Sequence, residues 1–175
     1  MIPLFLLLFA ALGVHPLQPG DPFPELKGEL LSGHNATLPA AAKGKIALLA
    51  LGFSRESQHA LEPWTKRYWA EFGQNDAVTF YTVPMIGSGG RFAKFFIEAG
   101  MKRDVPKTLQ DHFMVVFTDT DPWKARVSFK GENDAYLILL DAAGTVRWTH
   151  SGTFDEERFR ELAEAARRLA GPSHP

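Results

Sequence analysis

The chain has 175 residues, a net charge of −1, an apolar fraction of 45% and a charged fraction of 22%. These values predict one globular domain with a sizeable core, and they exclude an intrinsically disordered chain and argue against nucleic acid as a partner. Because the chain contains no cysteine, disulfides, thiolate nucleophiles, iron–sulfur clusters and cysteine-ligated zinc are excluded as well.

The first 20 residues contain no charged side chain. Residues 2–14 form one apolar run that is shorter than the roughly 20 residues needed to span a bilayer and suits the core of a secretory signal peptide. Three interpretations stay open: a cleaved export signal, an uncleaved N-terminal anchor, and a buried helix of the domain. We favour an exported protein, periplasmic or extracellular, with the N-terminus as a membrane anchor if it is not cleaved.

Prolines at 16, 19, 22 and 24 predict a stiff, non-helical linker after the apolar run. The expected organisation is therefore a signal or anchor with linker (1–20), a folded domain (21–171) and a short tail (172–175).

Hydrophobic patterning within the domain predicts strands that alternate with helices. The expected elements, in chain order, are a β-hairpin (25–38), a central strand (45–53), a helix (56–72), a strand (77–83), a helix (91–99), a strand (113–118), a short helix (121–127), a second hairpin (135–140 and 145–150) and a closing helix that begins after Thr153.

Three of these helices carry further signals. In the first, Leu61, Trp64, Tyr68 and Phe72 share a face that we expect to be buried. In the second, three phenylalanines have helical spacing and Gly100 is expected to end the helix. In the last, Thr153 to Glu156 form a capping box with Thr153 as the N-cap, and the expected buried stripe is Phe159, Leu162, Ala166 and Leu169.

The order of the elements predicts a three-layer α/β/α sandwich around a mixed sheet, because parallel βαβ units need helices on both faces. Together with the segments Gly20–Pro24, Gly52–Ser54 and Leu140–Trp148, this order resembles the thioredoxin-like superfamily. The N-terminal hairpin and the inserted strand and helix resemble its TlpA-like and peroxiredoxin-like branches.

A closer resemblance is to the thioredoxin-like family of the mitochondrial ATP synthase assembly factor. Pro63–Thr65 and the run Leu139–Gly152 carry it, in the pattern LLD-x-x-G-x-[IV]-R-W-x-x-x-G. That family also lacks the redox cysteines. The resemblance implies a protein-binding, assembly or chaperone module that helps to build a membrane or envelope complex.

The thioredoxin-type redox site is missing from the sequence. Residues 54–58 stand where a Cys-x-x-Cys motif would lie, and residues 133–135 stand where redox relatives have a cis-proline. Thiol–disulfide oxidoreductase and peroxidase activities are therefore excluded, and we expect neither a cofactor nor a metal. The former redox face is our candidate for binding a protein partner; its residues are Ser54, Arg55, Glu56 and Ser57, with Asn133 and Asp134 opposite.

Other interpretations remain open. An enzyme of another class would use Ser54 or Ser57 with His59, or a captured cofactor, and a small-molecule carrier is a third possibility. The basic residues between Arg91 and Lys107 indicate a solvated helix face or an anion site. Trp69 is either an aromatic residue at the edge of the core or an anchor in an interface.

Overall fold

The computed structural model describes residues 14–171; the apolar run up to residue 13 and the tail at 172–175 lie outside the described residues. With η marking 3₁₀ helices, the elements are β1 (Leu26–Leu30), β2 (Asn35–Leu38), η1 (Ala40–Ala42), β3 (Ile46–Gly52), α1 (Ser57–Phe72), β4 (Val78–Pro84), η2 (Ser88–Ala93), α2 (Lys94–Asp104), η3 (Lys107–His112), β5 (Met114–Val115), α3 (Asp121–Arg126), β6 (Ala135–Leu140), β7 (Val146–Gly152) and α4 (Glu156–Ala170).

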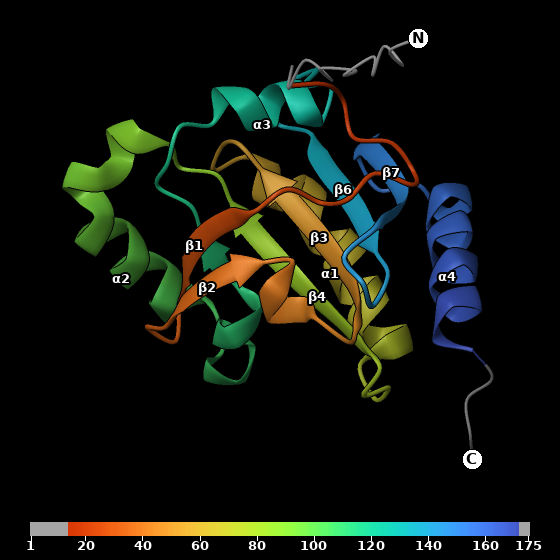
Figure 1. The fold of residues 1–175 in the computed structure, drawn as a ribbon. Coiled ribbons are helices and arrows are strands. Elements are labelled where there is room, and N and C mark those ends of the chain that lie inside the picture. Colours follow the sequence, from red (N-terminus) through yellow and green to blue (C-terminus); the bar gives the residue numbers. More distant parts are fainter. Residues whose placement is uncertain (1–13, 172–175) are drawn as a thin grey trace, which may run out of the picture.

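A four-stranded mixed sheet forms the centre of the domain, with the order β4-β3-β6-β7 (Figure 1). β3 runs parallel to β4 and antiparallel to β6, which forms the predicted second hairpin with β7. Every residue of β3, β4 and β6 is buried. β3 and β6 are continuous apolar runs, which are typical of strands that are covered on both faces.

The two faces of the sheet pack into two separate cores. One core joins the sheet to α1 and α4 through Trp64, Tyr68 and Phe159. The other joins it to the β1–β2 hairpin, to α3 through Trp123, and to the segment before β1. Figure 1 shows the hairpin in front of β3 and β4, and α1 behind them. The three-layer arrangement predicted from the sequence is therefore confirmed.

The strand expected at 113–118 is much shorter in the structure. β5 consists of two residues that pair antiparallel with β1, so that β2, β1 and β5 form a small second sheet. Single parallel bridges on either side of β5, from Phe113 to Thr82 and from Val116 to Met85, connect it to β4. β5 therefore links the two sheets, and the pairing ends at Val116.

The segment expected to be a linker packs onto the domain from Leu17 onward. Leu17 is buried, and its N–H donates to the carbonyl of Arg126 at 2.8 Å. The Gly20 N–H donates to the Val146 carbonyl, and the Val146 N–H donates to the Asp21 carbonyl. Through these hydrogen bonds, residues 20–21 pair with the start of the edge strand β7 and protect its free edge there. Within residues 14–171, no helix combines the length and apolarity needed to cross a bilayer.

The N-terminus of α4 lies two residues later than the sequence analysis predicted. Asp155, not Thr153, is the N-cap, and its Oδ1 accepts the Arg158 N–H at 2.8 Å. The rings of Phe154 and Phe159 lie 5.9 Å apart on either side of this cap. This is a hydrophobic staple, and it sets the point at which the chain enters the helix.

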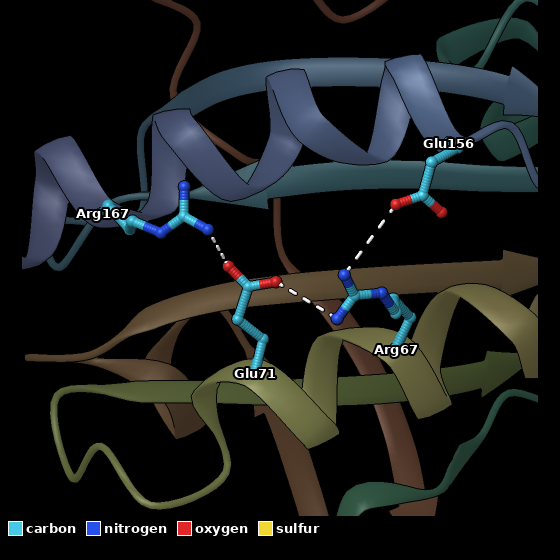
Figure 2. Close-up of polar contacts among 4 residues, drawn as sticks. All are labelled: Arg67, Glu71, Glu156 and Arg167. Atoms are coloured by element: carbon cyan, nitrogen blue, oxygen red, sulfur yellow. Dashed lines mark hydrogen bonds and ion pairs between the residues drawn. The ribbon is translucent and has the colours of Figure 1, made fainter.

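Ion pairs connect the two helices that cover the same face of the sheet (Figure 2). Glu71 of α1 accepts from Arg67 at 3.5 Å and from Arg167 of α4. Arg67 also lies 3.8 Å from Glu156 at the start of α4, and its guanidinium stacks over the Phe159 ring at 4.9 Å.

Candidate partner-binding site

The turn between β3 and α1 occupies the position of the missing redox motif. The Ser57 N–H donates to Ser54 Oγ at 3.1 Å, and the Ser57 hydroxyl donates back to the Ser54 carbonyl at 2.7 Å. Ser54 therefore supplies a side-chain acceptor for the first N–H group of α1, which begins at Ser57. A Cβ on Gly52 would collide with the Ser57 hydroxyl and lie 2.7 Å from Leu61 Cδ1. The tight turn therefore requires glycine at this position.

The structure brings Ser54 to the second half of the candidate surface. The Ser54 hydroxyl donates to the Glu132 carbonyl at 2.8 Å and lies 3.4 Å from Asn133 Oδ1. Asn133 is exposed and Asp134 is half-buried. Within residues 14–171 the one cis peptide is Leu38–Pro39, so the bonds around Asn133 are trans.

Ser57 differs from the other predicted residues because it is fully buried. Its side chain is therefore not accessible to a partner, because the hydroxyl is used inside the turn. In the described part of the chain neither Ser54 nor Ser57 bonds to a histidine. His59 is exposed, so the structure assembles no serine–histidine pair there.

Arg55 and Glu56 line a groove whose lining does not include Asn133 or Asp134. This groove, of about 570 Å³, runs along α1 and is closed on its far side by residues 104–113. We call it the α1 groove. Its apolar lining consists of Leu61, Trp69, Phe80, Val105, Pro106, Leu109 and Phe113. Charged side chains of both signs stand along it, namely Arg55, Glu56, Glu62, Lys66 and Asp104.

Thr82, which no sequence pattern marks as functional, also lines the α1 groove. Thr82 is only 2% exposed, and its hydroxyl has no hydrogen-bond partner among the described residues. A buried polar group without a partner costs about 1–3 kcal/mol. A bound group that supplied this hydrogen bond would recover part of that cost.

Trp69 is an aromatic residue at the edge of the core, as one of the two interpretations of the sequence expected. Its ring is 41% exposed and lines the α1 groove. It also lies 5.6 Å from the rings of Phe80 and His112. His112 in turn stacks on Phe80 at 4.7 Å, with its Nδ1 2.9 Å from the Phe80 carbonyl. This packing holds the indole in place at the wall of the groove.

A second cleft, of about 420 Å³, is lined by basic side chains. Arg126, Lys130 and Arg158 lie around it together with His150. Both carboxylate oxygens of Glu161 already bind Arg158, at 2.8 and 3.0 Å. Burial, and then the charge of Arg158, hold the pKa of His150 below its usual value. Among residues 14–171, no three histidine, aspartate or glutamate side chains gather closely enough to hold a metal ion.

The fold and the Ser54 turn define a thioredoxin-like domain without thiol chemistry. Three solved structures illustrate the likeness. A protein described as the thiol:disulfide interchange protein DsbE from Chlorobium tepidum is 20% identical, with a TM-score of 0.59, over 89% of this chain and 99% of that one. One described as a protein disulfide isomerase from Bacteroides thetaiotaomicron is 16% identical, with a TM-score of 0.60, over 88% of this chain and 91% of that one. BsSco, a member of the Sco family of cytochrome c oxidase assembly proteins, is 14% identical, with a TM-score of 0.56, over 86% of this chain and 96% of that one.

The chain belongs to the ATP10 protein family, which matches residues 20–169. No curated protein matches the sequence. Membership of this family supports an assembly-type role and implies protein partners. The resemblance drawn from residues 139–152 is thereby confirmed.

Proposed function

We propose that this protein is an exported assembly factor that holds an extended segment of a membrane-complex subunit in the α1 groove. The observation that carries the proposal is the Thr82 hydroxyl, which is buried without a partner among the described residues, beside the apolar lining of the α1 groove. An extended peptide offers backbone donors and acceptors at regular intervals, so it can satisfy such a group while its side chains cover the apolar wall. Export is proposed from the charge-free apolar run at 2–14.

The positions of the charges fit a peptide rather than a small metabolite. Arg55 and Glu56 are exposed at the end where α1 begins. The N–H groups of Gln58 and His59 already donate to the carbonyls of Arg55 and Glu56, at 3.2 and 3.1 Å. This end of α1 therefore offers a partner its helix dipole and the Arg55 guanidinium rather than free N–H groups. Because Glu56 opposes a carboxylate there, we expect a backbone carbonyl to be bound in preference to an acidic side chain.

Thr82→Val is the sharpest test, because it removes the hydroxyl while keeping the shape of the side chain. The free protein should be as stable as before, or more stable by up to about 1 kcal/mol, since no hydrogen bond is lost. Capture of partners by the tagged full chain, cross-linked in its native host and quantified by mass spectrometry, should fall. Arg55→Glu should also weaken capture.

Matched controls are available for both substitutions. Thr79 lies on the same strand with its side chain on the opposite face, so Thr79→Val should leave capture intact. Arg160 is exposed on α4, and Arg160→Glu should likewise have no effect. If the controls abolish capture while Thr82→Val and Arg55→Glu retain it, the partner binds elsewhere and the α1 groove is not the site.

A further inference from the structure

The helix expected at 91–99 begins and ends later than predicted, and its phenylalanines are exposed. η2 leads into α2, which continues past Gly100 to Asp104. Phe92 is 99% exposed, and Phe95 and Phe96 are each 77% exposed. The rings of Phe95 and Phe96 meet edge to face at 5.7 Å. We call these three residues the phenyl ridge.

Polar contacts account for this orientation of α2. Lys94 binds Glu29 of β1 and lies 3.8 Å from Glu98. Along the helix, Lys94, Ile97, Glu98 and Met101 are half-buried, whereas Ala99 and Lys102 are exposed together with the phenylalanines. The charged side chains Lys94 and Glu98 thus face the domain, and the aromatic side chains face outward. Soluble proteins rarely leave adjacent large apolar side chains so exposed without a binding purpose.

The charges around the phenyl ridge indicate what covers it. Five of the chain's 19 basic residues but only two of its 20 acidic residues lie between Ser88 and Lys107. Arg91, Lys102 and Arg103 are exposed beside the rings. A surface with the same charge, such as a second copy of this segment, would be repelled. A negatively charged surface with an apolar interior would match both the cations and the rings.

We propose that the phenyl ridge inserts into the headgroup layer of an anionic lipid bilayer, with Arg91, Lys102 and Arg103 contacting lipid phosphates. A helix with aromatic residues on one face and basic residues beside them lies in the plane of such an interface. The rings are largely exposed, so they can enter the headgroup layer without a matching groove in a partner. The contact is separate from the α1 groove, so it would orient the domain on the membrane while the groove binds a polypeptide.

The absence of native cysteine allows a local test in the full chain. A fluorophore that brightens in apolar surroundings is attached to Ala99→Cys, beside the ridge, or to Glu164→Cys, on the exposed face of α4. With vesicles of phosphatidylcholine and phosphatidylglycerol, the label at 99 should brighten several-fold and be quenched by nitroxide lipids. The label at 164 should do neither. Raising the salt to about 0.5 M should diminish the response, because screening weakens the attraction.

Two sets of substitutions separate the ridge from any membrane binding by the N-terminal run. Replacing Phe92, Phe95 and Phe96 together by serine should abolish the response of the label at 99 without lowering the melting temperature, because the rings are exposed. The double substitution Arg91→Glu and Lys102→Glu should abolish the fluorescence response of the label at 99 on the anionic vesicles.

Two outcomes would overturn the proposal. In one, the protein floats with the vesicles but the fluorescence of the label at 99 does not change. The same conclusion follows if the label at 99 brightens equally in the serine variant. The other is a response that rises with protein concentration when no vesicles are present, which would assign the ridge to self-association.

Discussion

Replacing Phe159 by alanine should be among the most damaging single changes in this domain. The side chain is 1% exposed, and its ring lies 5.9 Å from that of Phe154 and 6.4 Å from that of Trp64. Large-to-small substitutions of buried phenylalanine cost about 3–5 kcal/mol, and the cost is highest where neighbours cannot fill the cavity. The other buried residues of α4 are Leu162 and three alanines, at 163, 165 and 166. Because the alanines are too small to fill the space left by the ring, we expect about 4 kcal/mol.

Two milder substitutions provide an internal scale. Asp155→Ala removes the N-cap and should cost about 1 kcal/mol, within a range of roughly 0.5–2. Thr153→Ala, at the position that the sequence suggested for the cap, should change the stability by less than about 0.5 kcal/mol, since Thr153 is exposed.

Urea unfolding, followed by tryptophan fluorescence and by circular dichroism, measures all three variants. The fluorescence is a suitable probe because Trp64 lies in the same cluster as Phe159. The urea concentration at the midpoint should be highest for Thr153→Ala, lower for Asp155→Ala and lowest for Phe159→Ala. The slope of the unfolding free energy against urea concentration should be the same in all three variants. A Phe159→Ala variant no less stable than Asp155→Ala would refute the packing of α4 described above.

Two further predictions concern His150 and the N-terminus. The pKa of the half-buried His150 lies below its usual value of about 6.5 in the folded state. As the pH falls, the unfolded chain therefore takes up the proton on His150 at a higher pH than the folded chain does. The free energy of unfolding should be unaffected by this group above about pH 7, and should decrease as the pH drops through about 6.5 toward the lower folded pKa. His150→Phe should flatten this slope in urea midpoints measured between about pH 8 and about pH 5, and an unchanged slope would contradict the assignment. If the apolar run is an export signal, intact-mass analysis of the protein from its native envelope should find a chain beginning between Val14 and Asp21, whereas Met1 retained on a cytoplasmic species would reject export.

The sequence predicted the course of the chain closely where one signal was strong. The apolar runs that become β3 and β6 have a single favourable environment, a strand covered on both faces, because any other placement exposes their side chains to water. The hairpin of β6 and β7 and the buried face of α1 follow from equally clear periodicity. The cap of α4 was misplaced because Thr153 and Asp155 offer competing signals, and the packing of Phe154 against Phe159 decided between them.

The candidate site was accessible to sequence analysis only in part. The resemblance to redox domains located the turn at Ser54, and the structure joins that turn to residues 132–133 across the fold. The burial of Ser57 and the groove on the other side of Arg55 could not be foreseen. Whether the hydroxyl of Thr82 finds a partner depends on which atoms α1 and residues 104–113 bring to it, and those segments meet only in the tertiary structure.

By itself, the sequence determined that this is an α/β domain without thiol chemistry, because residue content and periodicity are local properties. It also placed the phenylalanines at 92, 95 and 96 at helical spacing. Periodicity specifies the angle between side chains on a helix but not which side of the helix faces the core. The tertiary structure decides which side faces the core: Glu29 of β1 binds Lys94, and the phenyl ridge therefore faces outward.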